Sequence, residues 1–192
     1  MELRPAHEGS RAREARFEAL SGVVAEPLHR YLRRRADADS VDDVLAETML
    51  VLWRRLEDVP GLGAEGSVDP DEVLPWCYGV TRGCLANARR TERRRLRLVE
   101  RLTQVAAPQP EAEADHLELH QALGTLGAVD REVVLLWAWE GLTPSAIAQV
   151  TGLTANAASI RLHRAKKKIA ARLDRKNAHQ AGHRTDEEGS RR

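Results

Sequence analysis

Residues 143–173 read TPSAIAQVTGLTANAASIRLHRAKKKIAARL, and this stretch decides the fold. Thr143 followed by Pro144 is typical of a helix N-terminus and predicts the start of a short helix. The turn at residues 151–153 contains a glycine, and Thr154 predicts the cap of a longer, basic helix. This order matches the helix-turn-helix pattern, in which the second helix enters the major groove of DNA.

The longer helix has an apolar and a polar face. Its predicted inner stripe consists of Ala158, Leu162, Ala165, Ile169 and Leu173. Outward side chains near its N-terminus are expected to contact base edges, and flanking cations are expected to pair with phosphates. The candidate DNA contacts are Asn156, Ser159, Ile160, Arg161, His163, Arg164 and Lys167. The alternative is an ordinary three-helix bundle with a solvated basic helix.

Basic residues cluster in two stretches, although the net charge of the whole chain is only +1. Residues 161–176 hold eight lysines and arginines against one acid, which favours DNA binding over the plain bundle. Residues 82–101 hold eight arginines against two acids. A solvated helix end is the alternative for this second stretch, but planar guanidinium groups suit phosphates and unpaired bases. The two stretches predict two contacts with nucleic acid.

Helical periodicity extends over the rest of the chain. Apolar residues recur at helical spacing from Phe17 to Leu32, and we expect a second helix to begin at Ser40 and a third to begin at Pro75. Residues 57–71 contain five glycines and prolines, which predicts a loop. In the second half of the chain, Asp130 is expected to cap a helix that carries Trp137 and Trp139. The four tryptophans lie on apolar stripes, so we expect core packing for them: Trp53, Trp76, Trp137 and Trp139.

These patterns predict an all-α protein of two small helical domains. We place the first domain at residues 14–101, a flexible linker at 102–113, the helix-turn-helix domain at 114–175 and a disordered tail at 176–192. The length of 192 residues allows two small domains, and an aromatic content of only 4% favours helices over sheets.

Several classes of protein are excluded by what the sequence lacks. No apolar stretch is long enough for a membrane span or a signal peptide, so we expect a cytoplasmic protein without membrane insertion. Cys77 and Cys84 lie seven residues apart in one predicted helix, which excludes a disulfide between them and does not match a zinc motif. We therefore expect no metal and no cofactor. No catalytic motif is present, so the protein is not expected to be an enzyme.

Three segments give a more specific resemblance. They are DDVLAETMLVLWRRL at residues 42–56, LPWCYGV at 74–80 and RLHRAK at 161–166. In this order and spacing they resemble bacterial extracytoplasmic-function sigma factors of the sigma-70 family. The resemblance implies that the first domain binds the RNA polymerase core and the minus-ten promoter element. It implies that the second domain binds the minus-thirty-five element.

The resemblance also assigns residues to these contacts. The clamp of the largest polymerase subunit would be bound by Asp43, Ala46, Glu47 and Leu50. The minus-ten DNA would be bound by Trp76, Arg82, Asn87, Arg89 and Arg90. Residues 57–71 resemble the loop that holds a base flipped out of the minus-ten strand. The chain departs from the family at four positions. Ala46 stands where Gln is frequent, Gly83 stands where Asn is frequent, and Ser159 and Lys166 stand where Arg is frequent.

Partners and alternatives follow from the resemblance. The expected partners are core RNA polymerase and promoter DNA, and the sequence leaves open whether an anti-sigma factor holds the protein inactive. The alternative function is a helix-turn-helix regulator that binds operators as a dimer without polymerase. Such a regulator needs a dimerisation surface, and residues 14–100 show no heptad seam. A nucleic-acid-modifying enzyme is a further alternative, for which the sequence offers no catalytic residues.

Overall fold

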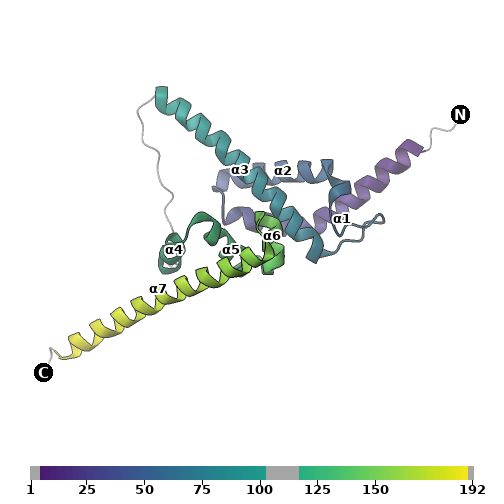
Figure 1. Ribbon diagram of the computed structural model, residues 1–192. Coiled ribbons are helices and arrows are strands. Elements are labelled where there is room, and N and C mark those ends of the chain that lie inside the picture. The colour runs from purple at the N-terminus through teal and green to yellow at the C-terminus, as the bar shows by residue number, and fades with distance from the viewer. Residues whose placement is uncertain (1–4, 103–116, 190–192) are drawn as a thin grey trace. The chain divides into compact units, whose positions relative to one another are not determined.

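The computed structural model describes the backbone of residues 5–102 and 117–189. It describes the side chains of residues 9–96, 119 and 121–173. Within these residues the regular elements are helices, and the only bridge between extended residues joins Leu62 and Val68. The chain divides into two compact units, residues 1–106 with 149–152 and residues 107–148 with 153–192. The predicted all-α fold with two helical units is confirmed (Figure 1).

Three helices form the first unit. They are α1 (Pro5–Arg33), α2 (Ala38–Arg54) and α3 (Pro70–Leu102), and each packs against the other two. A single 3-10 turn, η1 (Leu56–Asp58), follows α2. The core combines the apolar stripes that the periodicity predicts on α1 and α2 with the first half of α3. Its fully or nearly fully buried side chains include Leu20, Val24, Leu28, Leu32, Val44, Leu52, Leu56, Val73 and Cys77.

Two buried threonines lie in this core without leaving an unpaired hydroxyl. The Thr48 hydroxyl donates to the carbonyl of Val44 at 2.7 Å, and the Thr81 hydroxyl donates to the carbonyl of Cys77 at 2.8 Å. Each bond runs back one helical turn, so a polar side chain is buried at little cost. The helix periodicity therefore continues through Thr48 on the inner face of α2.

Two predicted helix starts in the first unit are wrong. Helix α2 begins at Ala38 with Asp37 as its N-cap, and the Ser40 hydroxyl donates to the Asp37 carbonyl at 2.9 Å instead of capping the helix. Helix α3 begins at Pro70, five residues before the expected start. Pro75 is the sixth residue of α3 and lies inside the helix, where it cannot donate the hydrogen bond that runs back to the carbonyl four residues earlier.

The second unit contains α4 (Leu117–Gly124), α5 (Ala128–Ala138), most of α6 (Pro144–Thr151) and α7 (Ala155–Gly189). The predicted helix-turn-helix is confirmed in α6 and α7. The Thr143 hydroxyl accepts a hydrogen bond from the Ala146 N–H, and the Thr154 hydroxyl accepts one from the Ala157 N–H, both at 3.2 Å. Gly152 adopts a φ of 74° in the turn between the helices, a conformation that favours glycine.

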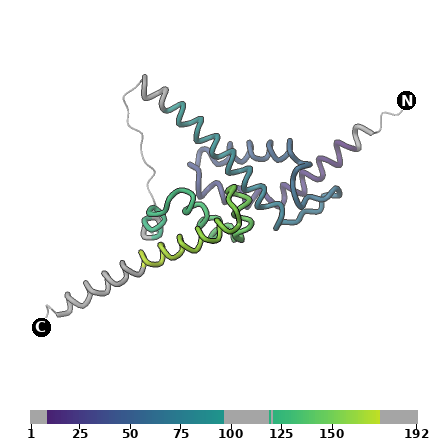
Figure 2. The backbone as a smooth tube through the Cα atoms, in the orientation of Figure 1, coloured from purple at the N-terminus to yellow at the C-terminus, as the bar shows by residue number. Residues whose placement is uncertain are grey.

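Other expectations for the second unit differ from the structure. Gly127, not Asp130, is the N-cap of α5. Trp137 and Trp139 are 40% and 39% exposed, so they are not core residues. The coloured part of α7 is one continuous helix (Figure 2). The backbone of α7 is helical to Gly189, where we expected a disordered tail from residue 176. No proline interrupts that segment, and its alanines, lysine and arginine favour helix. Residues 103–113 of the expected linker lie outside the described residues.

Candidate nucleic-acid interface

Helix α7 buries one face and exposes the other, as the sequence predicts. Ala158, Leu162 and Ala165 are buried. The side chains predicted to meet DNA are all exposed: Asn156, Ser159, Ile160, Arg161, His163, Arg164 and Lys167. Among them, Ile160 is an exposed large apolar residue, a type that can contact a thymine methyl group. The face thus combines an amide, a hydroxyl, an imidazole, an apolar group and cations.

The cations of α7 fall into two groups, because three of them contact the rest of the second unit. Arg161 donates to the Asp130 carboxylate at 2.6 Å, and Lys168 donates to the Thr125 carbonyl at 2.6 Å. The Lys166 ammonium lies 3.9 Å from the centre of the Trp137 ring, a cation–π contact that covers part of the exposed tryptophan. These contacts hold α7 against α4 and α5.

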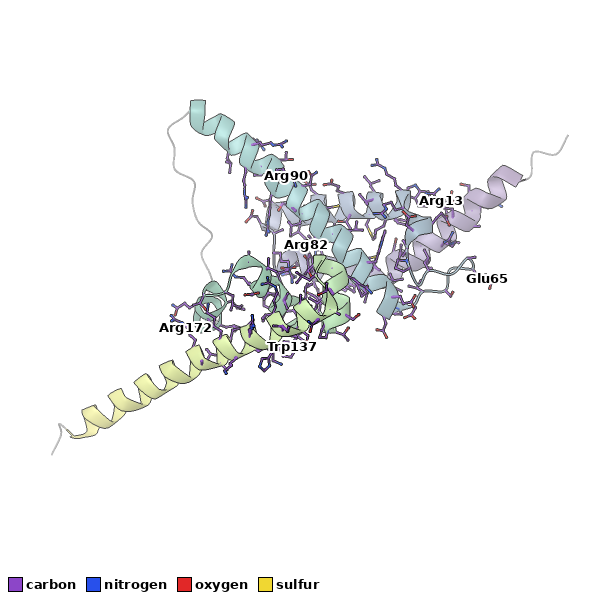
Figure 3. The ribbon with its side chains drawn as sticks, viewed as in Figure 1. Arg13, Glu65, Arg82, Arg90, Trp137 and Arg172 are labelled. Carbon is purple, nitrogen blue, oxygen red and sulfur yellow. The ribbon has the colours of Figure 1, made fainter. Side chains whose placement is uncertain are left out.

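The second group of cations points outward. Arg164, Lys167 and Arg172 form no ion pair or hydrogen bond with any other described residue. They therefore remain available to a polyanion, and Arg172 lies near the far end of the described side chains of α7 (Figure 3). Arg161 was predicted to contact DNA as well, but in the free protein Asp130 holds its guanidinium. From the sequence, Asp130 was expected only as a helix cap.

A shallow groove of about 380 Å³ lies beside the start of α7. Its lining includes Asp130, Asn156, Ile160, Arg161 and Arg164. A carboxylate, an amide and a guanidinium in one groove supply both hydrogen-bond acceptors and donors, as the edges of base pairs in the major groove require. Asn156, Ile160 and Arg164, which are predicted to contact DNA, therefore lie together in this groove.

The outward face of α2 carries the predicted polymerase contacts. Asp43, Ala46 and Glu47 are exposed, and Leu50 is 55% exposed. Val44 and Leu52 are buried on the opposite face. An exposed leucine beside two acids has no role in the core of the first unit, and such an apolar centre with a polar rim is typical of a protein-binding surface.

The loop predicted from its glycines and prolines occupies residues 59–69, which we call the glycine loop. Gly61 and Gly66 have φ angles of 71° and 82°, which few other residues adopt. The Gly63 N–H donates to the Ser67 carbonyl and the Asp69 N–H donates to the Gly61 carbonyl, both at 2.8 Å. Glu65 lies at the outer end of the loop, away from the helices (Figure 3).

The predicted minus-ten residues lie on α3, but they do not form one face. Arg82, Asn87, Arg89 and Arg90 are exposed, and Figure 3 shows Arg82 and Arg90 along the helix. At roughly 100° per residue, Arg82 and Arg89 share one face, whereas Asn87 lies on another with Trp76. Arg89 donates to the carbonyl of Arg35, so it also fixes the end of α1.

Trp76 is neither buried in the core nor free. Its side chain is half-buried, and the Arg55 guanidinium lies 5.0 Å from its ring centre. Trp53 is half-buried too, in contact with Phe17 at a centroid distance of 5.2 Å. The core packing expected for the tryptophans is therefore only partial in the first unit.

The cysteines offer no reactive or metal-binding site in the described part of the chain. Both are buried and free, and burial raises the pKa of the Cys77 thiol to about 12 and also raises the pKa of Cys84. A thiol held in its protonated form is neither a nucleophile nor a metal ligand. Among the described residues no three His, Cys, Asp or Glu side chains gather as a metal site, and none of the helices could span a membrane.

Comparison with known proteins gives matches over both units. The family model for sigma-70, region 4, matches residues 116–169. The RNA polymerase sigma factor CnrH of Cupriavidus metallidurans is 32% identical over 149 residues, which cover 70% of this chain and 73% of that protein. The RNA polymerase sigma factor NccH of Alcaligenes xylosoxydans xylosoxydans is 26% identical over 144 residues, covering 69% of this chain and 73% of the relative.

Solved structures agree with the fold. The sigma factor RpoE in complex with the anti-sigma factor NepR from Bartonella quintana matches with a TM-score of 0.58 at 17% identity, covering 82% of this chain and 96% of that one. The PhyRSL–NepR complex from Sphingomonas sp. Fr1 matches with a TM-score of 0.55 at 17% identity, covering 79% and 87%. At this identity the likeness concerns the fold alone. The sequence match to CnrH, together with the region 4 model, shows that the chain belongs to the extracytoplasmic-function sigma factors of the sigma-70 family.

Proposed function

We propose that this sigma factor directs core RNA polymerase to its promoters through two separate DNA contacts. The second unit would bind the minus-thirty-five element in duplex form. The first unit would bind the polymerase clamp and the melted minus-ten strand. The observation that carries the proposal is the outward face of α7, where Arg164 and Lys167 are exposed and unpaired among the described residues.

In the second unit, base reading and phosphate binding are assigned to different side chains. Asn156, Ile160 and Arg164 line the groove at the start of α7, so we assign them to base edges. Ser159 and His163 lie on the same exposed side and complete this set. Lys167 lies further along the helix, so we assign it to the phosphate backbone, which contributes affinity without sequence preference.

In the first unit, Leu50 is proposed as the centre of the clamp contact. A leucine that is 55% exposed loses unfavourable contact with water when a partner covers it. Asp43 and Glu47 on the same face would set the orientation of a basic partner. Ala46 adds a small apolar contact where the family often has glutamine.

The minus-ten contact is proposed for the glycine loop and α3. Extracting a base from the strand costs a few kcal/mol of stacking, which phosphate contacts by Arg82 and Arg90 would partly offset. Arg89 and Asn87 lie nearby on the exposed surface of α3. Trp76 is close to the start of α3 and offers an aromatic surface that is half-exposed.

The clamp contact can be tested by co-purification with core polymerase. We expect the double variant Asp43→Ala, Leu50→Ala to lose binding, because it removes the apolar centre and one acid of its rim. Asp42→Ala is the matched control, since Asp42 is an exposed acid about 100° further round the same helix. Binding that survives in the double variant, with helix content unchanged by circular dichroism, would remove the clamp assignment.

An anti-sigma factor is a further proposed partner. RpoE of Bartonella quintana, which shares this fold, was solved in complex with the anti-sigma factor NepR. The shared fold and the family membership support this proposal. A tagged form of the chain would be purified from its own organism, and the proteins bound to it would be identified. An anti-sigma factor among them should dissociate when core polymerase is added.

A further inference from the structure

Helix α1 contacts both the glycine loop and the 3-10 turn η1 that precedes it, although the two segments are far from α1 in sequence. The first contact precedes the loop, where Nη1 of Arg16 donates to both carboxylate oxygens of Glu57 in η1, at 3.0 and 2.8 Å. The second is at Gly66, where a Cβ atom would lie 3.7 Å from the Ala19 Cβ and 3.9 Å from the Arg16 Cα. Both contacts involve the same turn of α1, so this turn holds η1, directly before the loop, and the middle of the loop.

The loop itself is stiff, so its position depends on these contacts. The backbone bonds between Gly63 and Ser67 and between Gly61 and Asp69 close it into a narrow ribbon. A Cβ at Gly61 would lie 2.7 Å from the Glu72 Cβ, and one at Gly63 would collide with the Ser67 hydroxyl oxygen. A ribbon packed this closely moves as a body, not by internal rearrangement.

Helix α1 is in turn fixed at the end of α2. Arg13 donates to the Trp53 carbonyl at 2.7 Å, and its guanidinium lies 4.8 Å from the centre of the Trp53 ring. The Phe17 ring meets the same tryptophan edge to face. The Arg16 side chain is only 16% exposed. The turn of α1 that holds the loop is therefore itself held by packing on both sides.

We propose that Arg16 is a positioning residue for promoter selectivity: by holding Glu57, it fixes where the glycine loop meets the minus-ten strand. The inference rests on the proposed function, in which this loop receives a flipped base. A loop already fixed before binding pays less ordering entropy, and it fits one base better than the others. A loosened loop therefore lowers the preference for one base over the others more than it lowers the affinity for polymerase.

The test uses holoenzyme reconstituted with core polymerase and a promoter library randomised at each minus-ten position. Glu57→Gln removes the charge of the Arg16 partner, and Glu18→Gln is the matched control, because Glu18 is an exposed acid on α1. We expect Glu57→Gln to lower the ratio between the best and worst base at one minus-ten position by about 1.5- to 5-fold, the range for one partly exposed ion pair. Preferences at the minus-thirty-five element should not change.

A second variant and a second readout separate positioning from general destabilisation. Arg16→Lys keeps the charge but lacks the guanidinium fork, so it should retain part of the selectivity that Arg16→Ala loses. Hydrogen exchange of the Gly63 and Asp69 amides should accelerate in Glu57→Gln, while amides in the core of α2 keep their protection.

The outcomes distinguish the inference from the proposed function. Suppose that the wild type discriminates among bases at the minus-ten element and that Glu57→Gln leaves the ratio between the best and worst base unchanged. This result overturns the inference alone, whether or not hydrogen exchange in the loop accelerates. Loss of preference at the minus-thirty-five element to the same extent would also overturn it, since the effect would then be general. A wild-type holoenzyme that ignores the minus-ten sequence contradicts both.

Discussion

Replacing Asp130 with asparagine is expected to make duplex DNA binding by the full chain more dependent on salt. In the free protein the Asp130 carboxylate holds the Arg161 guanidinium at 2.6 Å, and both side chains are partly exposed. Arg161 also lines the groove that contains Arg164. Without the carboxylate, Arg161 is free to pair with a phosphate next to that groove.

The size of the effect follows from counterion release. One added phosphate contact steepens the dependence of log K on log salt by about 0.9, so affinity should fall about 3.5-fold more than in the wild type between 50 and 200 mM salt. The stability change should stay small. Asp130 lies in the first turn of α5, where an acid contributes about 0.3–1 kcal/mol through the helix dipole, and an exposed ion pair contributes about 0–1 kcal/mol.

Fluorescence anisotropy with a labelled duplex, at several salt concentrations, measures the slope. Asp39→Asn is the control, because it makes the same change in net charge at an exposed position in α2. Arg161→Ala should cancel the effect in the double variant. An unchanged slope in a folded Asp130→Asn protein would refute the reasoning, because it would mean that Arg161 leaves Asp130 for DNA already in the wild type.

Three further predictions concern the core, a thiol and the recognition helix. Leu52→Ala should lower the free energy of unfolding in urea by about 2–5 kcal/mol because Leu52 is fully buried, whereas Leu50→Ala should change it by less than about 0.5 kcal/mol. The pKa of Cys77 rises from 9.0 to about 12 on folding, so the unfolded thiol loses its proton first. Stability should therefore fall by up to about 1.4 kcal/mol per pH unit above pH 9, and this part of the fall should be absent in Cys77→Ala. Arg164→Ala should weaken duplex binding by about 1–3 kcal/mol and relax base preference, and identical motifs from wild type and variant in a selection would contradict its base-reading role.

Local sequence signals predicted much of the helix-turn-helix unit. The caps at Thr143 and Thr154 involve bonds to residues three positions along the chain, so the hydroxyls could be assigned from the sequence alone. The buried positions Ala158, Leu162 and Ala165 follow from the 3.6-residue period. The exposed Leu50 follows in the same way from the stripe of α2.

Contacts between helices were not predictable in this way. The bond between Asp130 and Arg161 spans 31 residues, and it depends on how α5 crosses α7. Residues 133–137 of α5 are all apolar, so they point in every direction around the helix. A small unit covers only part of such a helix, which leaves Trp137 exposed beneath Lys166.

The first unit shows the same limit. Glycines and prolines identified the loop, but its contact with α1 depends on Arg16 and Glu57, which are 41 residues apart. Likewise, the minus-ten residues could be assigned to α3 by resemblance, and their division between two faces follows from a helix that begins at Pro75, but the bond from Arg89 to the Arg35 carbonyl joins residues 54 positions apart. These assignments to promoter DNA stay predictions.

Mapping of transcript 5′ ends would show whether the protein selects the start sites of core RNA polymerase. Core RNA polymerase would transcribe fragments of the organism's genome with and without the purified protein. We expect a set of start sites that appear only with the protein and share two upstream sequence elements. Start sites that are the same in both reactions would contradict it.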